Sequence, residues 1–270
     1  MLAACGAKSF YCIWSNAFNS SSSHLKTLVL QSHTQPLPHA WLKTCIDSVK
    51  HWAHLNHFDY LFLGDELFNY ISKDILDKTI AQPVIATDLA RLIALQDFLN
   101  KGFDQVIWCD ADFLIFAPTK FSIRQEAYLL GREVWIQKDS KSKLTVNTKV
   151  HNAFMLFQQD NVFLKFYIDS AKRLLSLNKG SIPPQFIGPK FLTAIHNIIQ
   201  CPVLETAGML SPLVIHDIVE GKGSALTLFK QRSSEAITAA NLCSSLCDKQ
   251  SLTTQRIETC ISTLLNKQSI

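Results

Sequence analysis

The chain has 270 residues, of which 47% are hydrophobic and 18% are charged, a composition typical of a globular protein. Its formal net charge is +4, and its lysines and arginines are spread along the sequence and do not form long basic runs. This balance argues against nucleic acid as a partner, and the length suits one α/β domain over residues 1–270.

The first part of the chain predicts a strand, a helix and a second strand. Residues 10–14 (FYCIW) are expected to form a strand, followed by a Ser/Asn-rich loop, and Pro38 opens the helix. Apolar residues recur in that helix with the helical period, at Leu42, Cys45, Ile46, Val49, Trp52 and Ala53. The next strand is DYLFL, residues 59–63. This order indicates a right-handed parallel crossover.

A second helix and a buried strand follow. The segment ATDLARLIALQDFLNKG predicts a helix capped by Thr87 and stopped by Gly102. Its expected buried positions are Leu89, Leu92, Ile93 and Leu99. Residues 106–109 (VIWC) are continuously apolar, as in a central strand covered on both faces.

The remaining elements complete an α/β prediction. Strands are expected at residues 133–137 and 150–158, and helices at residues 161–177 and 189–200. The tail, residues 233–270, is predicted to be helical, with few candidate catalytic groups. Alternating strands and helices predict a central, mostly parallel sheet flanked by helices.

Two acids stand in the most apolar part of the sequence, Asp110 and Asp112 of VIWCDADFLIF. A buried carboxylate is costly unless it is paired or bound to a metal. At the carboxyl end of a central strand, where α/β sheets bind ligands, strand alternation would put both acids on one side and Ala111 on the other. Such a pair suits Mg²⁺ or Mn²⁺ together with phosphate oxygens. The alternative is that the acids merely begin a turn or a cap.

The helix with D-x-x-R, followed by the strand ending in D-x-D, resembles the donor site of nucleotide-sugar glycosyltransferases of the GT-A fold. The most similar groups are the retaining bacterial polysaccharide and mannosyl transferases and the glucosylating toxins. The resemblance continues in HNAFMLFQQDNVFLKFYID and IGPKFLTAI, so that it covers roughly residues 85–200. The lead-in GFDQVIW departs from the usual Gly-Gly-Ile/Val-Tyr and is closer to glycogenin-like enzymes.

The resemblance implies a metal-dependent transfer of a sugar with retention of configuration. Retention rests on the resemblance alone, because the sequence identifies no nucleophile or base. It implies that Asp110 and Asp112 hold Mn²⁺ or Mg²⁺ against the diphosphate of a nucleoside-diphosphate sugar, and that a saccharide, lipid or protein is the acceptor. The implied substrate-binding residues are Asp88, Arg91, Ala111, Asn152 and Gly188, and Arg91 would also act in catalysis. A late histidine, His216, is a candidate third metal ligand.

Each of these residues also has an ordinary structural interpretation. Asp88 and Arg91 can form a surface i,i+3 ion pair, and Asn152 can be a polar residue at a strand end. Gly188 with Pro189 can simply start a helix, and His216 can be structural.

Two other functions compete with a transferase. Phosphotransferases of the haloacid-dehalogenase type also have an apolar strand that ends in D-x-D, but near the N-terminus and with Thr or Val where this chain has Leu114. A catalytically degenerate fold that only binds a nucleotide or a sugar is the second alternative.

The cysteines and the hydropathy bear on location. Of the eight cysteines, Cys243 and Cys247 are four apart on an expected helix with Cys260 beyond, a weak candidate metal site, and others fall inside apolar patterns. No apolar run approaches the ~20 residues of a membrane helix. We therefore expect a soluble, cytoplasmic protein without a transmembrane segment.

Overall fold

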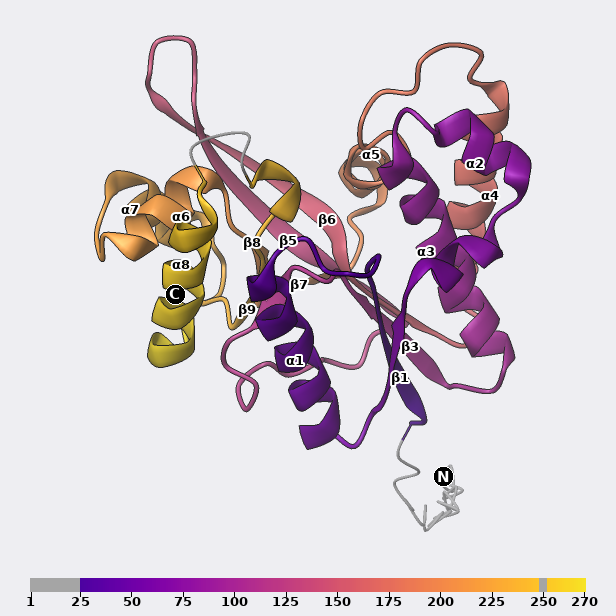
Figure 1. Cartoon of the computed structure of the whole chain (residues 1–270), viewed down its shortest axis with the longest axis horizontal. Coiled ribbons are helices and arrows are strands. Elements are labelled where there is room, and N and C mark those ends of the chain that lie inside the picture. Colours follow the sequence, from indigo (N-terminus) through magenta and orange to yellow (C-terminus); the bar gives the residue numbers. More distant parts are fainter. Residues whose placement is uncertain (1–24, 248–251) are drawn as a thin grey trace, which may run out of the picture.

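A mixed β-sheet forms the centre of the molecule (Figure 1). The computed structural model describes residues 25–247 and 252–270. In this part of the chain the sheet has six strands in the order β2-β1-β3-β6-β5-β7. Their bounds are Thr27–Ser32 (β1), Asp59–Leu63 (β2), Gln105–Cys109 (β3), Tyr128–Lys138 (β5), Leu144–Gln158 (β6) and Val203–Leu204 (β7). The pairs β1/β2, β1/β3 and β5/β7 are parallel, and β3/β6 and β5/β6 are antiparallel.

The first described strand, β1, was not expected from the sequence. The strand predicted at residues 10–14 lies outside the described residues. The sequence TLVLQS of β1 directly follows a serine-rich stretch, which led us to expect a loop there. The parallel crossover is nevertheless present, because β1 is joined to β2 through α1 (Ala40–Leu55). The buried side of α1 contains Leu42, Cys45, Val49, Trp52 and Ala53, as the period predicted.

The helix before the acidic motif, α3 (Pro83–Asn100), begins earlier than predicted. Pro83 occupies its first turn, where a missing N–H costs nothing. Thr87 is therefore inside the helix, and its hydroxyl donates to the Pro83 carbonyl at 3.3 Å instead of capping the N-terminus. The helix ends just before Gly102, whose φ of +92° suits a glycine stop. Two short elements precede it, η1 (Asp65–Tyr70) and α2 (Lys73–Thr79).

Strands β5 and β6 form one long hairpin that projects from the sheet (Figure 1). The predicted strands at residues 133–137 and 150–158 are parts of it. Asp139 holds the turn, since its Oδ1 accepts from the backbone N–H groups of Lys141 and Lys143. Two lysines of this region belong to the strands, Lys138 to β5 and Lys149 to β6.

The next two helices match the prediction closely. They are α4 (Val162–Leu177) and α5 (Pro189–Ile199). Asn161 caps α4, because its Oδ1 accepts from the Leu164 N–H at 3.0 Å. Gly188 immediately precedes α5.

The C-terminal part combines a small second sheet with helices. Three short strands pair in the order β4-β9-β8, at Phe113–Ile115, Ala239–Asn241 and Ala207–Met209. The helices are α6 (Pro212–Val219), α7 (Ser224–Arg232) and α8 (Thr254–Lys267). Helix α8 packs on the domain through Ile257, Cys260 and Leu264, as predicted for the tail. The first part of the tail is not α-helical, since it forms β9 and the 3-10 turn η2 (Ser244–Leu246).

No helix in the described part of the chain is both long and apolar enough to span a bilayer.

Candidate functional site

A cleft of about 630 Å³ opens at the carboxyl ends of β1 and β3. Strand β1 is paired with β2 on one side and with β3 on the other. The chain therefore runs from β1 to β2 in one direction across the sheet and then returns past β1 to β3. Such a switch point is where open α/β sheets bind ligands. The cleft is lined by the acidic motif, by the ends of β1 and α3, and by the β5–β6 hairpin. The predicted site residues Asp88, Arg91, Ala111 and Asn152 line it together with Asp110 and Asp112.

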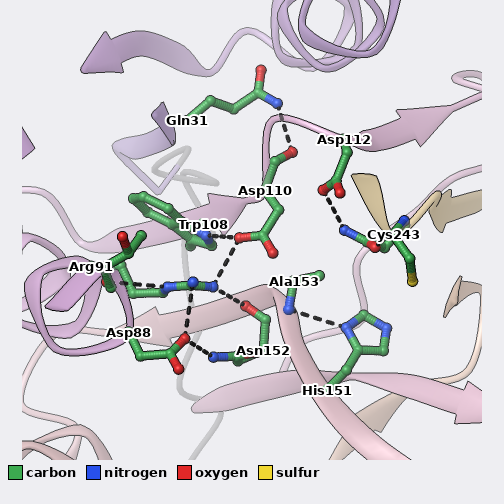
Figure 2. A network of polar contacts seen from close by, with 12 residues as sticks. Gln31, Asp88, Arg91, Trp108, Asp110, Asp112, His151, Asn152, Ala153 and Cys243 are labelled. Atoms are coloured by element: carbon green, nitrogen blue, oxygen red, sulfur yellow. Dashed lines mark hydrogen bonds and ion pairs between the residues drawn. The ribbon is translucent and has the colours of Figure 1, made fainter. Parts of the chain in front are cut away.

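Asp110 is fixed at the end of β3 through both its side chain and its backbone. Its Oδ1 accepts hydrogen bonds from Arg91 Nη1 at 2.8 Å and from Trp108 Nε1 at 2.7 Å (Figure 2). Its backbone carbonyl accepts from Gln31 Nε2 at 3.1 Å, and its N–H donates to the Ala153 carbonyl at 2.8 Å. Within the described residues its Oδ2 accepts no hydrogen bond, and the side chain is 26% exposed. One carboxylate oxygen is therefore left for a ligand.

Arg91 ties three elements together from inside the protein. Its side chain is only 6% exposed, and its Nη2 lies 2.9 Å from Asp88 Oδ1 on the same helix. Besides Asp110, Nη1 donates to the Asn152 carbonyl on β6 at 3.2 Å. The guanidinium also lies over the Trp108 ring, 5.3 Å from its centroid. The surface ion pair considered for Asp88 and Arg91 is thus wrong, because both side chains are buried.

Asp88 is held by Asn152, and Gly188 makes room for it. Asn152 Nδ2 donates to Asp88 Oδ1 at 2.8 Å. A Cβ on Gly188 would stand 2.6 Å from Asp88 Oδ2 and 3.2 Å from Asn152 Nδ2. Gly188 does not line the cleft, so it packs against Asp88 and is not one of the residues that would contact a ligand.

Asp112 lines the same cleft as Asp110, but its carboxylate is held by the C-terminal tail and not by Arg91 (Figure 2). The motif is a turn between β3 and β4, in which the Phe113 N–H donates to the Asp110 carbonyl at 3.0 Å. Asp112 Oδ1 accepts from Asn241 Nδ2 at 2.6 Å, and Oδ2 accepts from the Ser244 N–H at 2.7 Å. The tail that was expected to carry few functional groups therefore holds one of the two acids.

Burial and neighbouring charges shift the pKa values in this cluster. Burial raises the pKa of Asp110 to about 6, against the opposing effect of Arg91. Burial also raises the pKa of Asp88, while Arg91 and Asn152 lower it. For Arg91 burial acts to lower the pKa, but Asp110 and Asp88 outweigh it and the pKa is raised. The three carboxylates Asp88, Asp110 and Asp112 thus face a single guanidinium, which leaves two negative charges uncompensated when all are ionised.

The carboxylates Asp110 and Asp112 fit a divalent ion that also binds a substrate, rather than an ion whose ligands all come from the protein. Among the described residues no group of three or more His, Cys, Asp and Glu side chains is arranged to hold a metal. Mg²⁺ is commonly bound through one or two carboxylates, with phosphate oxygens and water completing its octahedron. Asp110, through its free Oδ2, and Asp112 can supply such a pair. The excess negative charge of the cluster favours a cation there.

His216 is not part of this arrangement. It lies on α6, its side chain is 48% exposed, and its Nδ1 is 3.4 Å from Asp217 Oδ1. It does not line the cleft. Cys243 and Cys247 also differ from the prediction, because they flank the 3-10 turn η2 and do not lie on a helix.

Several residues in the cleft or directly behind it were missed by sequence reasoning. Gln31 orients the Asp110 backbone and is itself held by the Tyr60 hydroxyl at 2.9 Å. Asn241 and Ser244 reach the site only through the fold of the tail, and no local pattern marks them. Glu133 and Trp135 line the cleft, and the alternation in EVWIQ was the available signal for them.

The sequence matches no protein-family model and no curated protein. Among solved structures, a glycosyltransferase involved in the glycosylation of the major capsid of PBCV-1 is 10% identical, with 88% of this chain and 98% of that chain covered and a TM-score of 0.45. The galactosyltransferase LgtC, in complex with donor and acceptor sugar analogs, is 10% identical, with 88% and 95% covered and a TM-score of 0.43. The apo-form glycosyltransferase GlyE of Streptococcus pneumoniae TIGR4 is 12% identical, with 90% and 62% covered and a TM-score of 0.45. At this level of similarity they assign no residue role and no activity to this chain.

Proposed function

We propose that this chain is a divalent-metal-dependent glycosyltransferase that moves a sugar from a nucleoside-diphosphate sugar to an acceptor hydroxyl. The observation that carries the proposal is the pair Asp110 and Asp112, which follows the carboxyl end of β3 and lines a cleft at the switch point of the sheet. The sequence resemblance of the D-x-x-R helix and the D-x-D strand to GT-A enzymes supports the same reaction. Retention of configuration belongs to the proposal through that resemblance.

Asp110 and Asp112 would hold Mn²⁺ or Mg²⁺ together with the diphosphate. When bound, the ion supplies Lewis-acid neutralisation of the charge that develops on the departing nucleoside diphosphate, typically worth several kcal/mol. Asp110 is suited to this because Arg91 and Trp108 fix one of its oxygens and leave the other towards the cleft. Asp112 is suited because Asn241 and the Ser244 N–H fix its carboxylate.

Arg91 has a positioning role in this proposal. Three of its N–H groups already donate, to Asp110, to the Asn152 carbonyl and to the Thr87 carbonyl, and Nη2 pairs with Asp88. Few of its five N–H groups remain for a phosphate. We therefore assign it to orienting Asp110 and Asp88, in place of the direct contact with the sugar or phosphate that the sequence resemblance implies.

Asp88 and Asn152 would bind hydroxyl groups of the donor. Both are almost fully buried, both line the cleft, and their mutual hydrogen bond fixes their orientation. A preorganised carboxylate–amide pair of this kind is suited to reading sugar hydroxyls, because neither group has to be reoriented when the ligand binds.

The test is a thermal-shift series with uridine and guanosine diphosphates, each with and without Mn²⁺. A transferase of this type should be stabilised by one nucleotide and Mn²⁺ together more than by either alone. A nucleotide-sugar hydrolysis screen then separates an enzyme from a binding module, since only the enzyme consumes a donor. No response to any nucleotide with Mn²⁺ would contradict the proposal.

A further inference from the structure

Glu133 is a buried acid that no described residue neutralises by contact. It lies on β5, is 9% exposed, and within the described part of the chain its carboxylate forms neither a hydrogen bond nor an ion pair. Burial raises its pKa, and the nearby charge of Lys149 lowers it only in part. A buried carboxylate without a partner costs stability, so its presence needs a reason outside the fold.

The side chain of Glu133 stands between two connected spaces. It lines the main cleft and also a smaller cavity of about 160 Å³. Lys149, Gln185 and Pro189 line both spaces as well, so the smaller cavity is a side arm of the cleft. A ligand that enters this arm meets the Glu133 carboxylate.

Strand alternation turns Glu133 and Trp135 to the cleft. The intervening Val134 and the following Ile136 are buried in the apolar cluster that includes α6 and α8. The opposite face of β5 carries Glu133, Trp135 and Gln137, and all three line the cleft. This face is polar on a strand whose other face is part of the core, which indicates that it contacts a polar ligand.

The neighbouring strand adds two polar groups to the same face. In the β5/β6 register Lys149 is opposite Glu133 and Asn147 is opposite Trp135, and both line the cleft. Within the described residues Trp135 has no ring contact with another aromatic side chain. A carboxylate, an amide, an ammonium group and a free indole face together match a saccharide, which offers hydroxyl groups around its edge and C–H groups on its faces.

The position of this face relative to the motif decides which substrate it takes. The switch point, where the nucleotide is expected, lies between β1 and β3, and β6 and β5 follow on the other side of β3. A donor held there by Asp110 and Asp112 leaves the hairpin side of the cleft for the second substrate. The hairpin projects beyond the sheet on that side (Figure 1).

We propose that Glu133, Trp135, Asn147 and Lys149 form the acceptor subsite, that the acceptor is a saccharide, and that Glu133 accepts a hydrogen bond from one of its hydroxyl groups. This inference rests on the proposed function, because it presupposes that the other half of the cleft holds the donor. A lipid acceptor would need an apolar channel in this arm, which instead presents Glu133, Lys149 and Lys190.

The experiment is a glycan-array measurement on the whole protein with Mn²⁺ and the nucleotide that stabilises it, comparing wild type, Glu133→Gln and Trp135→Ala. Glu258→Gln is the matched control, since Glu258 is exposed on α8 and its substitution removes the same charge. Wild type and control should retain the same saccharides, and both site variants should bind them at least ten-fold more weakly. The nucleotide affinity should be the same in all four proteins.

The outcomes separate this inference from the proposed function. Wild-type protein that binds the nucleotide but retains no saccharide, or Glu133→Gln that retains saccharides as wild type does, would overturn the acceptor assignment alone. Absence of nucleotide binding by wild type would instead contradict the proposed function. A purely structural Glu133 would lower the melting temperature when replaced, whereas we expect Glu133→Gln to melt at or above the wild-type temperature, because it removes an unpaired buried charge.

Discussion

Arg91 Nη1 lies 2.8 Å from Asp110 Oδ1, while Nη2 of the same guanidinium lies 2.9 Å from Asp88 Oδ1. One buried cation on α3 thus orients two acids that come from different elements. The orientation of both acids depends on the two Nη groups of the guanidinium. A lysine at this position has a single ammonium group and cannot reproduce both contacts.

The first prediction concerns the stability of this cluster. Arg91→Met removes the cation and leaves the buried Asp88 unpaired, so the free energy of unfolding should fall by about 3–5 kcal/mol. The double variant Arg91→Met/Asp88→Asn should lose less than the sum of the two single changes, because the second change removes the stranded charge. Denaturant unfolding of the three variants measures this. Strictly additive losses would show that the two side chains are not coupled.

The second prediction concerns Gly188. A Cβ on this residue would stand 2.6 Å from Asp88 Oδ2, so Gly188→Ala must displace the Asp88 carboxylate. We expect a cost of about 1–3 kcal/mol in unfolding free energy from overpacking, and a loss of donor binding, seen as a raised KM for the nucleotide sugar. Gly180→Ala is the control, since nothing lies within 4 Å of a Cβ at that position. Equal effects of the two substitutions would contradict a specific role for Gly188.

The third prediction separates Asp112 from Asp110. Both oxygens of Asp112 accept hydrogen bonds, from Asn241 and from the Ser244 N–H, so Asp112→Asn must turn an NH₂ group towards a donor. Leaving these buried groups mispaired should cost about 1–3 kcal/mol of unfolding free energy. Asp112→Asn that unfolds at the wild-type denaturant concentration would contradict the role of these bonds.

The fourth prediction concerns pH and His151. Its Nε2 donates to the Ala207 carbonyl at 3.1 Å while Nδ1 accepts from the Ala153 N–H at 3.1 Å, which defines a neutral ring. Burial lowers its pKa from 6.5 to about 4. Because the folded pKa lies below the unfolded value, the contribution of His151 to stability is complete above pH 6.5 and is lost as pH falls towards 4, by about 3 kcal/mol.

An NMR titration of the His151 ring measures that pKa directly. The difference in unfolding free energy between wild type and His151→Gln should shrink as the pH is lowered through the same interval. A ring that titrates near pH 6.5, with a difference that does not depend on pH, would contradict this assignment.

The central elements could be predicted from the sequence because their signals are local. Continuous apolar runs identified β2 and β3, and the helical period with capping residues identified α1, α4 and α5. The start of α3 was misplaced because Thr87 is a good N-cap in isolation, while Pro83 and the packing of Ile85 and Ala86 extend the helix by a turn. Strand β1 was missed because it directly follows a serine-rich stretch.

The candidate site could be predicted only as far as its residues lie close together in sequence. Asp88, Arg91, Asp110 and Asp112 fall within one helix–strand unit, and their convergence on one cleft was predictable. The hydrogen bonds from Asn241 and Ser244 to Asp112 join residues more than a hundred positions apart, and no local sequence pattern predicts such contacts. The turn at Asp110–Ala111–Asp112 was missed because strand alternation was assumed to continue through it.

The most direct test of the proposed function is the Mn²⁺-dependent affinity for uridine or guanosine diphosphate in wild type and Asp110→Asn, measured by isothermal titration calorimetry. An asparagine can keep the Oδ1 contacts to Arg91 and Trp108 and replaces only the free Oδ2, so the fold should survive. Asp74→Asn, an exposed acid on α2, is the control. We predict that Mn²⁺ strengthens nucleotide binding by wild type and by the control, and that Asp110→Asn loses most of this gain while its melting temperature stays close to that of wild type. An Asp110→Asn protein that keeps the full Mn²⁺-dependent gain would contradict the account.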